Sequence, residues 1–193
     1  MKKEQRTLYI KNMVCDRCIK VVKEELEKLG FEINKIVLGE VNAEGKFGKD
    51  NLAKIKNVLE ENGFELIEDR RGKIIEKIKS EIINLIFRND SIPDNLRLSK
   101  FLEENLDHDY HYLSSLFSSV ENVTIEQFFI LQKIERAKEL VKYGELTLGE
   151  IAFKLGYSSV QHLSAQFKKV TGFTASQFKN QTAQLRKPID KVK

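Results

Sequence analysis

From residue 73 almost to the end of the chain, apolar residues recur with the 3.6-residue period of α-helices, which strongly limits the possible folds. The first run contains Ile74, Ile75, Ile78, Ile82, Leu85 and Ile86. Further helices are expected over residues 98–106, 109–120, 124–143, 147–155, 159–171 and 174–185, with turns at Asp107, Gly144, Gly156 and Gly172. The spacing therefore predicts an all-α second domain of about seven helices.

Before residue 73 the sequence switches between strand-like alternation and helical spacing. Strands are expected over 7–13, within 31–41, between Gly39 and Gly45, and over 64–67. Helices are expected between them, with inner faces formed by Ile19, Val22, Leu26 and Leu29, and by Leu52, Ile55, Val58 and Leu59. The predicted order is βαββαβ, which makes the whole chain α+β.

Arg70-Arg71-Gly72 is a polar segment between these two patterns, and we interpret it as a break between domains. A chain of 193 residues suits one small and one medium domain. The expected domains are 1–72 and 73–185, followed by a disordered basic tail over 186–193.

Composition excludes several classes of protein. No run approaches the roughly 18 apolar residues of a membrane span, and the charged N-terminus has no apolar secretion segment, so we expect a cytoplasmic protein with no membrane partner. Two cysteines three residues apart indicate metal or redox chemistry rather than a disulfide scaffold. We also expect no enzyme, because no phosphate-binding glycine loop, Ser-His-Asp spacing or paired carboxylate site is present.

The positive charge is concentrated in the C-terminal part of the chain. The net charge is about +1 over residues 1–72, about −2 over 73–120 and about +5 over 121–193. A solvated basic face explains such an excess as readily as nucleic-acid binding does, so charge alone does not decide between them.

Residues 147–172 have the pattern of a helix-turn-helix. A short helix with inward Ile151 and small Ala152 meets a turn at Gly156, and a second helix places Leu163 and Phe167 inward. The outward positions of the second helix would face base edges in a major groove, with two lysines near the phosphates. These outward residues are Val160, Gln161, Ser164, Ala165, Lys168 and Lys169.

These residues resemble the second helix-turn-helix of AraC/XylS-type regulators, which end in Phe-Lys-Lys-x-Thr-Gly-x-Thr, here residues 167–174, followed by Phe178-Lys179. Residues 112–117 are similar to the first recognition helix of that family, and residues 134–140 to its connecting helix. The resemblance covers roughly 73–180 and implies a DNA-binding domain with two readers. A connecting helix of about 20 residues is about 30 Å long, close to the ~34 Å turn of B-DNA.

The two units depart from the family in different ways. In the first, Ser115, Ser118 and Ser119 stand where basic residues are usual, and Asp107 and Asp109 add negative charge. In the second, Ala165 stands for a frequent Arg and Ala175 for the usual Pro. We therefore hypothesise that Gln161, Lys168 and Lys169 supply most of the affinity. His111, Ser114 and Ser115 of the first unit are expected to be short-range readers.

Met13-Val-Cys15-Asp-Arg-Cys18 lies between an expected strand and helix. It resembles the Met-x-Cys-x-x-Cys loop of heavy-metal-associated domains, which implies a ferredoxin-like fold over about residues 6–69 and binding of soft ions. Cys18 is expected in the first helical turn, where the helix dipole favours the thiolate. Cys15 and Cys18 suit two-coordinate Cu(I) better than tetrahedral Zn(II). Met13 is expected in the core, while His108 and His111 are left out of the metal site.

The sequence leaves alternatives open for the first domain. The cysteines are also compatible with a redox pair or with inert thiols. The predicted function is a DNA-binding transcription regulator that responds to a soft metal ion or to oxidation at Cys15 and Cys18. The alternatives are a metallochaperone or metal buffer whose helical half docks a protein, and a regulator whose first domain only dimerises. Expected partners are double-stranded DNA, a soft metal ion, a second copy in a homodimer, and RNA polymerase if the chain is an activator.

Overall fold

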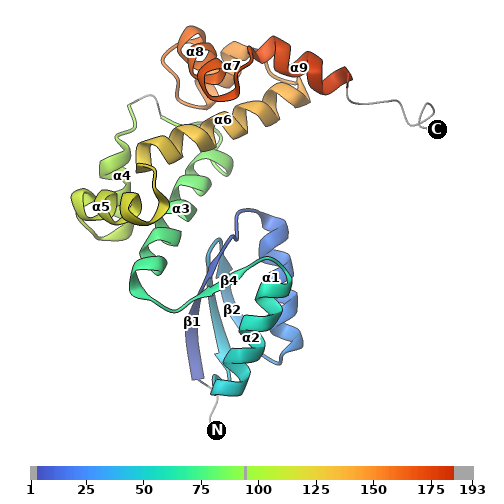
Figure 1. Cartoon of the computed structure of the whole chain (residues 1–193), viewed down its shortest axis with the longest axis vertical. Coiled ribbons are helices and arrows are strands. Elements are labelled where there is room, and N and C mark those ends of the chain that lie inside the picture. The colour runs from blue at the N-terminus through green and yellow to red at the C-terminus, as the bar shows by residue number, and fades with distance from the viewer. Residues whose placement is uncertain (1–3, 94, 185–193) are drawn as a thin grey trace, which may run out of the picture. The chain divides into compact units, whose positions relative to one another are not determined.

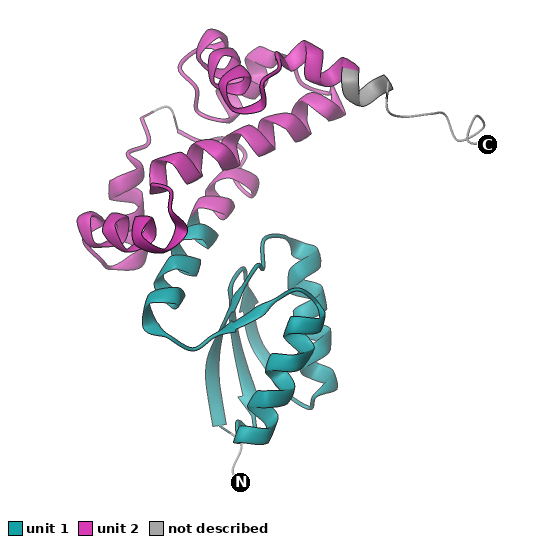
Figure 2. Ribbon diagram, viewed as in Figure 1, with its two compact units in different colours: residues 1–81 teal, residues 82–193 magenta. Residues whose placement is uncertain are grey.

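The computed structural model describes residues 4–93 and 95–184 and divides into two compact units, residues 1–81 and 82–193 (Figure 2). The division lies within one helix, α3 (Arg70–Phe87). The polar break predicted at Arg70-Arg71-Gly72 is therefore wrong, because these residues are the first turn of α3. Asp69 caps this turn, since its Oδ1 accepts a hydrogen bond from Gly72 N at 2.8 Å.

Unit 1 has the predicted βαββαβ order (Figure 1). Its elements are β1 (Glu4–Lys11), α1 (Asp16–Lys28), β2 (Glu32–Val37), β3 (Glu40–Gly45), α2 (Lys49–Glu61) and β4 (Glu65–Ile67). The strands form one sheet in the order β2-β3-β1-β4, and each neighbouring pair is antiparallel. The more specific assignment as a ferredoxin-like domain stays a prediction.

The core of unit 1 lies between the sheet and its two helices. Strand alternation turns Leu8 and Ile10 of β1 toward this core, where helical spacing brings Val22 of α1 and Ile55 of α2 against them. Burying each large aliphatic side chain stabilises the unit by roughly 1.5–3 kcal/mol. The part of α3 that belongs to unit 1 packs on the rest of the unit, since Ser80 Oγ donates to Leu38 O at 3.0 Å.

Unit 2 is helical, as predicted. After α3 follow α4 (Leu98–Leu106), α5 (Tyr110–Glu121), α6 (Ile125–Tyr143), α7 (Leu148–Lys154), α8 (Val160–Thr171) and α9 (Ala175–Gln184). Most of these helices begin one residue after the predicted start, because the predicted first residue is the N-cap. The caps are Asp109, Thr124, Thr147 and Ser159. The predicted tail, 186–193, lies outside the described residues.

Helix α6 is the central element of unit 2, and α5, α7, α8 and α9 each pack against it. Its Ile134 and Ala137 are fully buried. The small Ala137 side chain allows neighbouring helices to approach closely. Within the described residues, the helices are too short or too polar to cross a lipid bilayer.

Candidate functional site

The segment from α7 to α8 is held by two caps and one tight turn. Thr147 Oγ1 accepts from Glu150 N at 3.2 Å, and the Glu150 carboxylate accepts from Thr147 N at 2.7 Å, which together form a capping box. Gly156 has a φ of 62°, as the predicted left-handed turn requires. Ser159 Oγ then accepts from His162 N at 3.1 Å and starts α8. The local sequence thus fixes where each helix of the pair begins.

The inner face of α8 is the predicted one. Leu163 and Phe167 are fully buried, and Ile151 and Ala152 of α7 are buried with them. The Phe167 ring packs edge-on against Phe178 of α9, with the ring centroids 5.6 Å apart. Helix α8 therefore has a single orientation relative to α7 and α9, and its opposite face turns outward.

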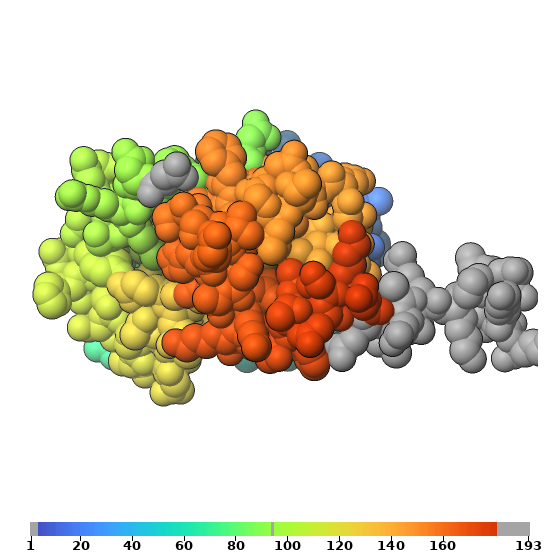
Figure 3. Space-filling model, turned by 90° about the horizontal axis from the view of Figure 1, so that it is seen from above, coloured from blue at the N-terminus to red at the C-terminus, as the bar shows by residue number. Residues whose placement is uncertain are grey.

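The residues predicted to contact DNA from α8 do lie on its outer side. Gln161, Ala165, Lys168 and Lys169 are exposed, Ser164 is half-buried, and Val160 is 36% exposed at the edge of the face. In the space-filling view, residues of α7 to α9 form a continuous surface beside α6 (Figure 3). The outer face of α8 belongs to one helix, and a major groove of B-DNA is wide enough to admit one α-helix.

The segment from α8 to α9 carries only positive formal charge. Between Gly156 and Asn180 the charged residues are Lys168, Lys169 and Lys179, and all three are exposed. The last carboxylate before this segment, Glu150, is used in the cap of α7. The potential near α8 is therefore attractive to a polyanion.

The first predicted unit, α4 and α5, has the opposite charge. His111 and Ser115 are exposed on α5 and Ser114 is half-buried, so the three predicted readers lie together near its beginning. Asp107 takes the left-handed turn conformation, with a φ of 54°. Asp109, which we interpreted only as an unfavourable charge, has a structural role: its carboxylate accepts from Tyr112 N at 3.2 Å and caps α5.

Sequence reasoning missed Lys133 of α6, which supports the turn before α8. Although it is a lysine, only 7% of it is exposed. Its Nζ donates to Gly156 O at 3.4 Å and lies 3.7 Å from the centre of the Tyr157 ring. Burial lowers the pKa of Lys133 from its usual range to about 8. The sequence did offer one indication that Lys133 is buried, because it lies on the same helical face as Ala137, four residues later.

The pH dependence of stability should reveal this buried amine. Above pH 8 folded Lys133 loses its proton, whereas in the unfolded chain it stays protonated until about pH 10.5. Because the unfolded state then binds more protons, the free energy of unfolding rises with pH, by about 1 kcal/mol between pH 8 and pH 9. Burial raises the pKa of Tyr157 above its usual value, so Tyr157 opposes this gain only above about pH 10.

Urea denaturation of the wild type and of Lys133→Met at pH 7, 8 and 9 tests this assignment. Since Tyr157 is present in both proteins, the difference between them isolates Lys133. We expect the free energy of unfolding to rise by about 1 kcal/mol more in the wild type than in Lys133→Met between pH 8 and pH 9. If the free energy of unfolding changed with pH in the same way for both proteins, the burial of a charged amine at this turn would be contradicted.

The cysteine loop joins β1 to α1. Met13 is 2% exposed and belongs to the core of unit 1, as predicted. Cys15 is exposed, Cys18 is half-buried, and their sulfur atoms lie 3.2 Å apart. The sequence pattern therefore brings the two thiols into contact at the surface.

The prediction that Cys18 favours the thiolate stays a prediction. The pKa of Cys15 is lowered from its usual value. Cys15 is the N-cap of α1, and Cys18 lies in the first turn. The pKa of Cys15 is lowered by the Cys18 thiol and then by the backbone amides of Cys18 and Arg17, against a smaller opposing effect of burial. The start of α1 therefore favours the thiolate form of Cys15.

Comparisons with known proteins support the interpretation of unit 2. The family described as "Helix-turn-helix domain" matches residues 105–181. The F1 operon positive regulatory protein of Yersinia pestis is 28% identical over 94 residues, covering 42% of this chain and 31% of that protein. An uncharacterized HTH-type transcriptional regulator of Bacillus subtilis, YtdP, is 24% identical over 170 residues, covering 86% and 22%. The chain thus spans about a fifth to a third of the length of these relatives.

Among solved structures, the C-terminal domain of AraT, a response regulator from Geobacillus stearothermophilus, is similar in fold. The TM-score is 0.50 with 22% identity, and the match covers 65% of this chain and 95% of that domain. Together these findings show that residues 105–181 match a helix-turn-helix domain and that the fold resembles that of the AraT C-terminal domain. The heavy-metal-associated assignment of unit 1 stays a prediction.

Proposed function

We propose that the AraC-type domain of this chain binds duplex DNA sequence-specifically and that the protein regulates transcription. The observation that carries the proposal is the outer face of α8, which is exposed, free of carboxylates and flanked by Lys168 and Lys169. In a major groove, Gln161 offers paired donor and acceptor groups to adenine, and Ala165 offers a methyl group to thymine. The lysines then reach phosphates, which gives affinity without sequence preference.

The length of α6 supports contact with two successive major grooves. This helix has 19 residues, so at about 1.5 Å per residue it is about 28 Å long. One turn of B-DNA is about 34 Å. Because α5 and α8 both pack against α6, this helix separates the two readers. Since α5 has acidic neighbours and no lysine or arginine, α8 supplies most of the affinity in this proposal, and His111, Ser114 and Ser115 act as short-range readers.

Substitutions on α8 should separate base reading from phosphate binding. Gln161→Ala is expected to cost about 1–3 kcal/mol of binding and to relax preference at one base position. Lys168→Ala is expected to weaken binding to all sequences alike and to lower the salt slope by about one unit. Both effects are measurable by fluorescence anisotropy on a duplex from random-sequence selection, at several salt concentrations.

The control is Lys20→Ala, which removes the same charge from an exposed position on α1 of unit 1. We expect it to bind as the wild type does. If Lys20→Ala and Lys168→Ala weakened binding equally, net charge rather than α8 would account for the affinity. If Gln161→Ala left the base preference unchanged, the assignment of this residue as a reader would be wrong.

A second proposal concerns the thiol loop, and it is supported by the contact between the two sulfur atoms. Two adjacent thiols, one exposed and with a lowered pKa, suit a soft ion in two-coordinate geometry such as Cu(I). Within the described residues, no group of three or more His, Cys, Asp or Glu side chains is placed to hold a metal ion. A tetrahedral Zn(II) site would therefore need further ligands from elsewhere or from a second molecule.

In this proposal, a soft ion or oxidation at Cys15 and Cys18 alters operator affinity. By linkage, operator DNA must then change ion affinity by the same factor. The test is a cuprous titration of the wild type and of the Cys15→Ser, Cys18→Ser variant, each followed by DNA binding. We expect binding of one ion by the wild type only, with a change in DNA affinity of about 5-fold or more.

The other outcomes separate the remaining candidates. Ion uptake with unchanged DNA affinity would favour a metal buffer or metallochaperone. An effect of oxidation without ion uptake would favour a redox pair. If neither treatment acted, the cysteines would be inert, and unit 1 would remain a candidate for homodimerisation, which sedimentation at several protein concentrations measures.

A further inference from the structure

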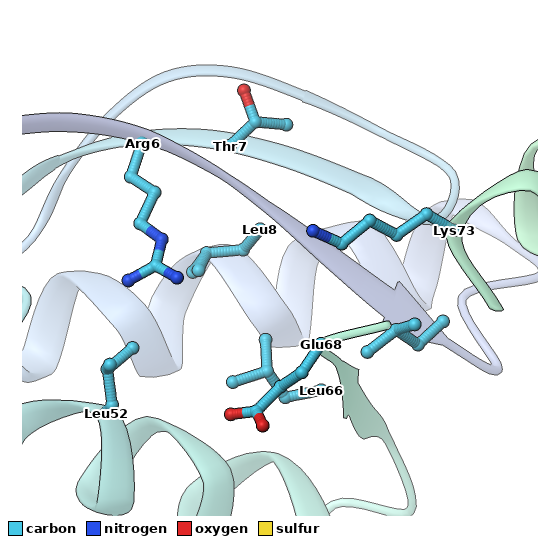
Figure 4. Close-up of a pocket in the computed structure, with 8 residues that line it drawn as sticks. Arg6, Thr7, Leu8, Leu52, Leu66, Glu68 and Lys73 are labelled. Carbon is cyan, nitrogen blue, oxygen red and sulfur yellow. The ribbon is translucent and has the colours of Figure 1, made fainter. Parts of the chain in front are cut away.

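A pocket of about 250 Å³ opens in unit 1 beside the end of β4 (Figure 4). Its walls come from β1, α2, β4 and the first turn of α3. All of these residues belong to unit 1, and the thiol loop is not among them. The pocket is therefore separate from both sites described above.

The pocket exists because β4 is much shorter than β1. Strand β4 pairs only with Tyr9, Ile10 and Lys11, so the first half of β1 has no strand partner on that side within the described residues. Ile10 N donates to Gly39 O, on the β3 side. Because successive residues of a strand direct their main-chain groups to opposite sides, the N–H and C=O of Thr7 point toward β4 and into this space.

Charged side chains surround the opening. Arg6 and Glu68 extend toward the same space, Lys73 approaches from α3, and the Thr7 side chain points away (Figure 4). Within the part of the chain that the structure describes, neither Arg6 nor Glu68 forms an ion pair; Arg6 lies 5.8 Å from the centre of the Phe47 ring. One carboxylate against two cations leaves a net charge of +1, which favours a single negative charge on an occupant.

Part of the pocket lining is apolar. Leu8, Leu52 and Leu66 form this part, and Leu8 is buried in the core of unit 1. A volume of about 250 Å³ equals that of roughly eight water molecules, at ~30 Å³ each. A compound of about eight non-hydrogen atoms is therefore the right size for this pocket.

We propose that this pocket binds a small monocarboxylate with a branched apolar body. Arg6 pairs with the carboxylate, and the N–H of Thr7 donates a further hydrogen bond to it. Lys73, whose Nζ lies 5.1 Å from the centre of the Tyr9 ring, adds positive charge nearby. The apolar body packs on Leu52 and Leu66 and removes their exposed parts from water. Glu68 disfavours a second negative charge on the ligand.

The probes are sodium 4-methylpentanoate, which has eight non-hydrogen atoms, and 4-methylpentan-1-ol, which has the same apolar body without the charge. Calorimetric titration of the full chain should give saturable binding of the carboxylate and at least about tenfold weaker binding of the alcohol. In two-dimensional amide NMR spectra, the carboxylate should shift the signals of Thr7, Leu52 and Leu66. No saturation at about 10 mM, or equal binding of the alcohol, would overturn the proposal.

Two variants of β1 provide a matched comparison. Arg6→Gln removes the cation at the pocket, and Lys11→Gln removes a partly exposed cation of the same strand that lies outside it. We expect Arg6→Gln to weaken binding at least about tenfold and Lys11→Gln less than about twofold, with both variants unfolding as the wild type does in urea. Equal affinities for the two variants would overturn the assignment of Arg6, and amide shifts outside the pocket would overturn its location.

Discussion

Phe167→Ala is expected to lower the free energy of unfolding of unit 2 by about 3–5 kcal/mol. Phe167 is 0% exposed, and its ring joins α8 to α9 through Phe178. Removing the ring leaves a cavity that the helices cannot fill without losing the orientation of α8. Since the outer face of α8 depends on that orientation, DNA affinity should fall as well.

Phe173→Ala is the matched control, because it makes the same chemical change at a residue that is 40% exposed. We expect a loss of about 1 kcal/mol or less for this variant, and no change in DNA affinity. Urea denaturation and DNA titration of both variants decide the question. A similar loss of stability for the two would show that Phe167 does not anchor α8.

Gly156→Ala is expected to cost about 2–4 kcal/mol, from two separate causes. The left-handed backbone at this position disfavours any Cβ by roughly 1–2 kcal/mol. An added Cβ would also lie 3.0 Å from Ile92 Cγ2 and 3.1 Å from Ile92 O. Ile92 is buried, and its N–H is bonded to Lys154 O at 2.9 Å, so it has little room to move.

Gly172→Ala separates the two causes. Gly172 has a φ of 79°, but an added Cβ there would have no atom within 4 Å. We therefore expect this variant to lose only the conformational part, about 1–2 kcal/mol, and to keep its DNA affinity. Thermal and urea unfolding measure the loss of stability of each variant. If Gly156→Ala and Gly172→Ala lost the same stability, the contact with Ile92 would be unimportant.

The helices of unit 2 could be predicted closely because their limits are encoded locally. A polar cap such as Thr147 or Ser159 precedes the apolar periods of α5 to α8, and Gly144, Gly156 and Gly172 end or separate helices. The helical spacing of the apolar residues also predicted which residues of α8 lie on its outer face. Local patterns are reliable here because each cap satisfies backbone groups within three or four residues of itself.

Features that depend on distant residues were not predictable in the same way. Lys133 and Gly156 are far apart in sequence, and only the packing of α6 against the turn brings them together. Asp69 was not recognised as a cap, because Arg70 and Arg71 suggested a polar linker. In unit 1 the element order could be predicted, but the register could not. The short pairing of β4 with β1, and hence the pocket beside Arg6, depends on that register.

Helix α3 bears on how this chain can be divided for study. A fragment that begins at residue 73 would start inside α3, without the Asp69 cap and the helix's first three residues. A fragment that ends at residue 72 would expose Tyr9, which Lys73 and Lys77 cover in the full chain. Transplanting either half onto a foreign partner therefore requires that all 18 residues of this helix accompany it.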